Sequence, residues 1–127
     1  MPRGTDKRPP VAIGHVRFRT SDVPAAAEWL TAAGLRPIVT GRSFAVLELR
    51  GGTHLVVSKV AKPPKKRAEA PFDLMVDDVD QAHRTYAQKG FKPSRIRRGS
   101  IHDSFHVLGP DECRIEVLSS HAGNRAI

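Results

Sequence analysis

The sequence contains an internal repeat, and this repeat restricts the possible folds more than any other feature. The segment Ser21–Pro37 aligns without a gap with Asp77–Pro93, each residue matching the one 56 positions later. Each copy has an aspartate near its start, suited to accept the free N–H groups of a first helical turn. Each copy also has a glycine suited to end a helix, followed three residues later by a proline. The repeat therefore predicts two equivalent helices of about three turns each, in two equivalent halves of the chain.

Strand patterns surround both predicted helices. Before the helices, the stretches 11–20 and 72–76 alternate apolar and polar residues, as strands with one buried face do. After the helices, three further strands are predicted in each half, at 36–40, 43–49 and 53–59 and at 92–97, 104–108 and 114–119. Each half therefore has the order β-α-β-β-β. We expect an α+β fold in which two tandem βαβββ modules form a cup-shaped mixed sheet with the helices on its outside.

The length of 127 residues fits one domain. The expected boundaries are a flexible basic tail at 1–10, a single domain at 11–121, and a loose C-terminus at 122–127. Within the domain we expect module one at 11–59, a solvated linker at 60–70 and module two at 71–121.

The formal net charge of +8 is concentrated outside the two predicted modules. Half or more of the excess lies in the tail and in the stretch 59–70, where it can attract an anionic ligand. These stretches have no interleaved aromatic residues for base stacking, so we expect a small-molecule partner rather than nucleic acid. No apolar run approaches the ~20 residues that span a bilayer, and residues 1–10 lack the hydrophobic region expected of a secretory signal. With the lone Cys113, this predicts a cytoplasmic protein without a membrane partner.

Three motifs, together with the duplicated pattern, make residues 11–121 resemble the vicinal oxygen chelate superfamily. They are Gly14-His15-Val16-Arg17-Phe18, Val76-Asp77-Asp78-Val79-Asp80 and Gly109-Pro110-Asp111-Glu112-Cys113-Arg114-Ile115-Glu116-Val117. In the last motif, Gly109 and Glu112 replace an aspartate and a glycine of the family's turn. The superfamily includes glyoxalase I, extradiol dioxygenases and bleomycin-resistance proteins.

The resemblance implies four metal-ligand positions that line the cup, on the first and last strand of each module. Carried over by position, the first strands give His15 and Pro71, and the last strand of module two gives Glu116. Pro71 has no ligating side chain, which counts against glyoxalase I activity in particular. The fourth position falls on His54 if the last strands align with an offset of 62, which assumes a longer turn in module two.

The fourth position depends on that alignment, because a shift would place Leu55 or Val56 there instead of His54. With His54, the implied set is His15, His54 and Glu116. Two imidazoles and one carboxylate suit a divalent Fe, Mn, Zn or Ni ion with open positions for substrate oxygens. Each of the three residues could also be an ordinary polar side chain on the exposed face of a strand.

Strand alternation places further polar residues on the cup face. Arg17 and Arg19 share the face of His15 and are candidates to bind a substrate carboxylate. Asp73 matches Arg17 at the offset of 56, so it is a candidate for an ion pair with Arg17 or for proton transfer. His121 could close over the site, or it could belong to a disordered tail.

The segment from 100 to 106 is rich in hydrogen-bonding groups. At an offset of 61, Phe105 and Val107 match Phe44 and Val46, and we expect all four to face the helices. His102, Ser104 and His106 would then face the cup. His102 and His106 are candidates for substrate contact or general-base catalysis, and the alternative is a histidine that bonds its own turn.

Two functions fit these expectations. The first is a metal-dependent isomerase, lyase or dioxygenase, in which the metal chelates two adjacent substrate oxygens as a Lewis acid. The alternative is a metal-free protein of the bleomycin-resistance type, which sequesters a small molecule in the cup. Analogy with the family also predicts a homodimer, with the cup built either within one chain or across two.

Overall fold

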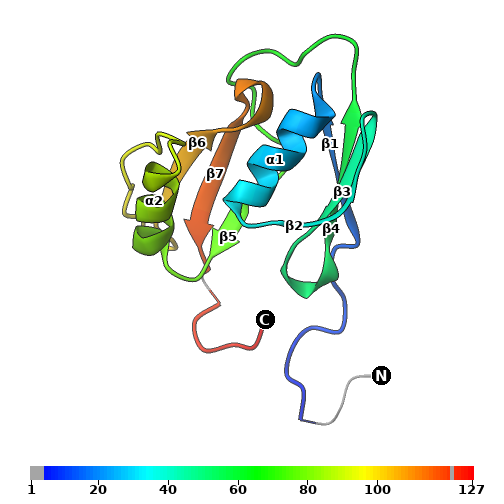
Figure 1. Ribbon diagram of the computed structural model, residues 1–127. Helices are drawn as coiled ribbons and strands as arrows, with labels where there is room; N and C mark the ends of the chain where they lie inside the picture. Colours follow the sequence, from blue (N-terminus) through cyan, green and yellow to red (C-terminus); the bar gives the residue numbers. More distant parts are fainter. Residues whose placement is uncertain (1–4, 121) are drawn as a thin grey trace.

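The computed structural model describes residues 5–120 and 122–127 (Figure 1). Module one contains β1 (His15–Thr20), α1 (Val23–Ala33), β2 (Arg36–Thr40), β3 (Phe44–Glu48), the 3-10 turn η1 (Arg50–Gly52) and β4 (His54–Lys59). Module two contains β5 (Leu74–Val76), α2 (Val79–Gln88), β6 (Ser104–Leu108), the 3-10 turn η2 (Pro110–Glu112) and β7 (Arg114–Ser119). The α+β class and the tandem arrangement of two helix-and-sheet modules are therefore confirmed. Neither helix of the described chain is long and apolar enough to cross a bilayer.

Each module forms its own sheet with the same connectivity. Sheet A has the strand order β1-β4-β3-β2, and sheet B has the order β5-β7-β6. In both sheets the first strand of the module runs parallel to the last strand, and the last two strands are antiparallel. The first strands, β1 and β5, therefore lie at sheet edges that meet no further strand of the described chain.

The strand expected at 92–97 in module two is not formed. Lys92 adopts a left-handed conformation with φ of 52°, and Pro93 has no N–H group to donate. The segment keeps a hydrogen bond from the Ser94 N–H to the His106 carbonyl at 2.9 Å, and Arg97 forms an isolated bridge with Ser104. This loop therefore covers the edge of β6 without continuing the sheet.

Two other strands are shorter than the sequence predicts. Residues 11–14 are not part of β1, because its partner β4 begins at His54, directly opposite His15. β5 begins at Leu74, shortly after Pro71. The linker 60–70 is mostly exposed, and at its end Ala68 and Ala70 exchange backbone hydrogen bonds with Arg114 at 2.8 and 2.9 Å.

Both helices begin and end as the repeat predicts. The carboxylates of Asp22 and Asp78 accept hydrogen bonds from the backbone N–H three residues later, at 3.1 and 3.0 Å. Gly34, with φ of 122°, ends α1, and Gly90, with φ of 80°, follows α2.

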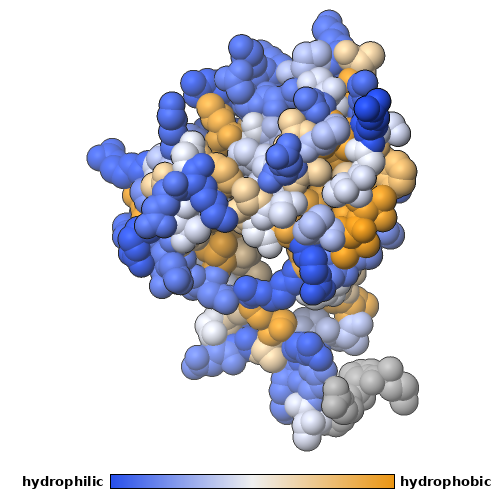
Figure 2. Space-filling model, in the orientation of Figure 1, coloured by the Kyte–Doolittle hydropathy of each residue, from blue (hydrophilic) through white to orange (hydrophobic). Residues whose placement is uncertain are grey.

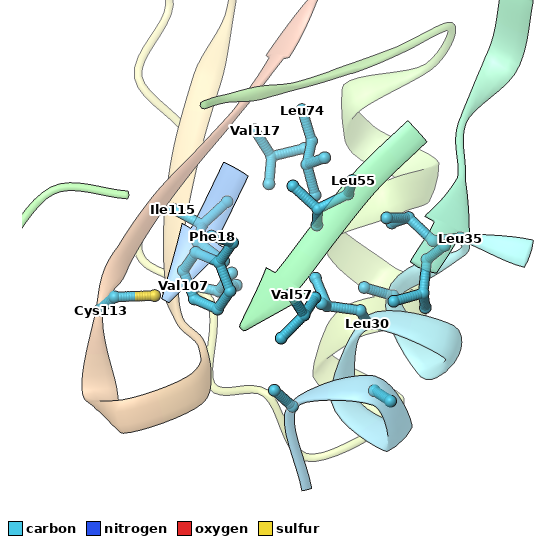
Figure 3. Packing of buried hydrophobic residues seen from close by; sticks show 14 of the residues in the cluster. Phe18, Leu30, Leu35, Leu55, Val57, Leu74, Val107, Cys113, Ile115 and Val117 are labelled. Atoms are coloured by element: carbon cyan, nitrogen blue, oxygen red, sulfur yellow. The ribbon is translucent and has the colours of Figure 1, made fainter. Parts of the chain in front are cut away.

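One apolar core joins the modules. Figure 3 shows Phe18 and Leu55 of sheet A packed beside Val107, Ile115 and Val117 of sheet B. These side chains come from the inner face of each sheet. The opposite faces, called here the outer faces, point away from this core, and they carry most of the polar residues of the strands.

A groove remains between the modules, next to this core. Its volume is about 660 Å³, and its walls are mainly apolar, from both modules. Figure 2 shows an opening at this place, below α1 in the orientation of Figure 1. At its rim, Arg50 and Asp77 form an ion pair at 3.0 Å that links the two modules.

Candidate functional site

The turns before the last strands show how the two modules align. In module one, the Leu49 N–H donates to the Thr53 carbonyl at 2.8 Å. In module two, the Gly109 N–H donates to the Cys113 carbonyl at the same distance. The two turns thus have equal length, and each bonded residue of module one lies 60 positions before its equivalent in module two. The expected offset of 62, with its longer second turn, is wrong.

The strand register agrees with the offset of 60. Ala45 pairs with Val57 in sheet A, and Phe105 pairs with Val117 in sheet B. The residue equivalent to Glu116 is therefore Val56, and the equivalent of His54 is Arg114. His54 lies on the outer face, as expected, but two residues away from the position that the alignment assigned to it.

The same register corrects the expectation for β3. Phe105 and Val107 are buried, as expected, but their equivalents are Ala45 and Leu47, which are also buried. Phe44 and Val46, which were expected to face the helices, lie on the outer face; Phe44 is 49% exposed. The outer face of sheet A, which is the face expected to line the cup, is consequently more apolar than the sequence predicted.

A polar row crosses the outer face of sheet A. His15, His54, Glu48 and Arg36 are register partners on four adjacent strands. The rings of His15 and His54 have centroids 6.0 Å apart, and the His54 Nε2 lies 2.9 Å from a Glu48 carboxylate oxygen. Arg36 also binds this carboxylate. Hydrogen bonds from Arg36 and then from His54 lower the pKa of Glu48.

The other outer-face rows of sheet A combine arginines with apolar residues. Arg17 is in register with Val56 and Val46, and Arg19 with Ser58 and Phe44. Both arginines are exposed, and neither forms an ion pair with a described residue. The ion pair between Arg17 and Asp73, one of the two roles considered for these residues, is therefore absent from the described chain.

Sheet B has a second polar group on its own outer face. His106 lies directly opposite Glu116, and Asp73 lines the same surface hollow as Glu116. An Arg114 nitrogen lies 3.7 Å from a Glu116 carboxylate oxygen. Burial, followed by the positive charge of Arg114, lowers the pKa of His106, although the charge of Glu116 opposes this effect. His102 lies in the loop before β6 rather than on a strand.

The predicted metal ligands do not meet within one chain. His15 and His54 are neighbours on sheet A, whereas Glu116 belongs to sheet B. Among residues 5–120 and 122–127, no three His, Cys, Asp or Glu side chains are arranged to hold a metal ion. Of the four positions that the resemblance implies, only those of His15 and Glu116 carry ligating groups, because the other two hold Pro71 and Val56. A resident metal within a single chain does not fit these residues. His121 lies outside the described residues.

Cys113 lies on the core side of the turn before β7 and is 5% exposed. Burial raises the pKa of its thiol to about 11. At pH 7.5 we therefore expect iodoacetamide to alkylate native Cys113 on the order of 100-fold more slowly than the unfolded chain, because only the thiolate reacts. Mass spectrometry of timed samples, with and without urea, measures the two rates. Equal rates would contradict the burial of this thiol.

Comparison with known proteins identifies the fold. No family model matches the sequence, and no curated protein matches it. Lactoylglutathione lyase from Agrobacterium tumefaciens has a similar structure, with a TM-score of 0.73 at 15% identity over 92% of this chain and 99% of that one.

Two further solved structures have the same architecture. A possible glyoxalase from Bacillus cereus gives a TM-score of 0.66 at 24% identity, over 84% of this chain and 97% of that one. The bleomycin-binding protein from Streptomyces verticillus, complexed with copper(II)-bleomycin, gives 0.66 at 17% identity, over 89% and 99%. The chain therefore has the fold of the vicinal oxygen chelate superfamily, which it shares with glyoxalases and bleomycin-binding proteins.

Proposed function

We propose that this chain is a metal-free small-molecule-binding protein of the bleomycin-resistance type, which captures its ligand on the outer faces of its sheets. The register of the strands carries this proposal. It puts Val56 at the position equivalent to Glu116, while Pro71 occupies the position equivalent to His15. Neither side chain can ligate a metal, so half of the family's four ligand positions are lost.

The composition of the outer face of sheet A also favours binding. Val46, Val56 and the half-exposed Phe44 form an apolar surface beside Arg17 and Arg19. Such a surface can pack against an apolar molecule while a few polar groups orient it. The structure of the similar Streptomyces verticillus protein contains copper(II)-bleomycin, and it supports the idea that this fold can serve ligand capture alone.

The direction of the outer faces supports capture of the ligand between two copies of the chain. Both faces point away from the shared core, so a ligand on one face would stay open to solvent. Small-molecule sites bury most of the ligand surface, typically about 70–90%. We therefore include in the proposal a homodimer in which sheet A of one protomer faces sheet B of its partner.

A metal-dependent enzyme is the second candidate, and the contact between His15 and His54 favours it. In such a dimer, Glu116 of the partner subunit could complete a set of two imidazoles and one carboxylate. The metal would supply Lewis-acid stabilisation of two vicinal substrate oxygens. His106 or Asp73, beside Glu116, would then move protons, and His54 would have to give up its contact with Glu48.

Metal titration of the full chain separates these candidates. Protein purified without a metal-affinity tag is dialysed against a chelator and titrated with Fe(II), Mn(II), Zn(II) and Ni(II) in a calorimeter. We expect no saturable binding of any of the four ions in the calorimeter. We also expect elemental analysis of the protein before dialysis to find less than one equivalent of metal per site. His15→Ala and Glu116→Ala should leave both readouts unchanged. Stoichiometric metal that both substitutions abolish would overturn the proposal and support the enzyme.

A further inference from the structure

A groove separates β1 from the linker that joins the modules. Its volume is about 390 Å³, and it is lined by Arg17, Phe18 and Arg19 on one side and by Pro64, Ala68 and Pro71 on the other. In Figure 1 the linker passes over the top of the molecule, and Figure 2 shows mainly hydrophilic side chains there. Apart from the two arginines, the groove is lined mainly by small apolar and proline residues, which suit a flat apolar body.

The two arginines give the lining of this groove a net positive charge. Their side chains leave β1 on the same face, about 6.7 Å apart along the strand. Neither has an ion-pair partner among the described residues, so both guanidinium groups are available to a ligand. Glu69 also lines the groove, but its side chain is 77% exposed and lies 3.9 Å from Arg114.

The linker carries further positive charge next in sequence to Pro64, which lines the groove. Lys62 and Lys65 are exposed and form no ion pair with a described residue, whereas Lys66 pairs with Glu112 at 3.2 Å. Charges of one sign around a concave surface raise the local concentration of oppositely charged ligands. Charge complementarity therefore favours an anion over the cationic ligands that an acidic cup would attract.

We propose that this groove binds the anionic group of a small aromatic or apolar molecule that carries a carboxylate, sulfonate or phosphate. The proposal rests on the proposed function and names its ligand class. Guanidinium groups bind such oxyanions through paired, charge-assisted hydrogen bonds. The apolar body of the ligand would extend from the groove onto the Val56 and Phe44 side of sheet A.

Fluorescent probes that differ only in charge test this assignment. The anionic probe is 1-anilinonaphthalene-8-sulfonate, and the neutral probe is N-phenyl-1-naphthylamine, which has the same ring system without the sulfonate. Binding to the full chain is measured by fluorescence titration, with stoichiometry from calorimetry. The test variant is the double substitution Arg17→Gln and Arg19→Gln. The control variant, Arg42→Gln with Arg84→Gln, removes the same charge from exposed arginines that do not line the groove.

We expect the wild type to bind one anionic probe per chain. The test variant should weaken this binding by on the order of 10- to 100-fold, while the control variant changes it by less than about twofold. Binding of the neutral probe should not differ between wild type and test variant. Cooperative thermal unfolding of each variant shows that probe fluorescence does not come from a loosened core.

Three results would overturn the inference. In the first, the test variant binds the anionic probe as tightly as the control variant does. In the second, its affinity for the neutral probe falls as much as its affinity for the anionic probe. A duplex oligonucleotide could also bind more tightly than the probe and depend on the same two arginines. Failure of the proposed function has a different signature, because stoichiometric metal at His15 and Glu116 would appear in the titration whatever the probes show.

Discussion

Replacing Tyr86 with alanine is expected to lower the free energy of unfolding by about 3–5 kcal/mol, which is a large part of the total for a small domain. The Tyr86 side chain lies between the modules and is 5% exposed. Its hydroxyl donates to the Ala33 carbonyl at the end of α1, at 2.6 Å. Its ring lies 5.3 Å from the ring of Phe91, which stacks on Trp29 at 4.7 Å. The substitution would remove these contacts between α2 and the end of α1 and enlarge the groove that the Tyr86 side chain lines.

The matched control is Tyr86→Phe, which keeps the ring and removes only the hydrogen bond. It should cost about 1–3 kcal/mol, because the buried Ala33 carbonyl loses its donor. Urea denaturation followed by circular dichroism gives both values, and an unchanged slope shows that the unfolded states are comparable. If the alanine variant is no less stable than the phenylalanine variant, the aromatic ring does not join the modules.

The features that the sequence predicted correctly are those fixed by neighbours along the chain. Asp22 and Asp78 cap their helices through bonds to residues three positions later, and Gly34 ends its helix within one turn. Such local signals are visible in a single sequence. The duplication then gave the arrangement of the modules, because two copies of one pattern fold alike.

The position of His54 depended on a register that local pattern does not fix. Residues alternate between the two faces of a strand, so an alignment shifted by two residues keeps every side chain on the same face. The alignment therefore put His54 on the correct face but made it equivalent to Glu116, whereas its true equivalent in module two is Arg114. Only the pairing with His15 and Glu48 shows which row of the sheet it joins.

The face of β3 could not be read from alternation either. The run Phe44-Ala45-Val46-Leu47 is apolar throughout, so either pair could be the buried one. The structure buries the smaller Ala45 together with Leu47 and leaves Phe44 half exposed. Contacts with α1 from elsewhere in the module decide this choice, and a strand read alone does not contain them.

Asp111 is a residue whose role sequence reasoning missed, because its partners lie about 90 positions away. Its carboxylate accepts hydrogen bonds from the Thr20 hydroxyl at 2.9 Å, and from the Ser21 N–H and hydroxyl at 2.8 and 2.6 Å. The turn of module two thereby holds the end of β1 in module one. Asp111 has φ of 55°, a left-handed conformation that aspartate tolerates better than most residues.

Asp111→Ala is therefore expected to destabilise the native state by about 2–4 kcal/mol, through lost hydrogen bonds to a charged acceptor and through backbone strain. Asp111→Gly separates the two causes, because glycine relieves the strain but restores no bond. It should recover about 1 kcal/mol of the loss. If glycine instead recovers the whole loss, the carboxylate contributes nothing to the joint between the modules.

The contribution of Asp111 should also depend on pH. Burial raises the pKa of its carboxyl, but the hydrogen bonds from Ser21 and Thr20 outweigh this effect and leave the pKa below its ordinary value. A carboxylate with a lowered folded-state pKa stabilises the protein fully above its unfolded pKa of about 3.9, and this stabilisation is lost as pH falls through the folded pKa. The stability difference between wild type and Asp111→Asn, measured by urea denaturation, should thus be constant from pH 7 to 5 and shrink below about pH 4. A difference that stays constant down to pH 2 would show that the ionised carboxylate is not what joins the two modules.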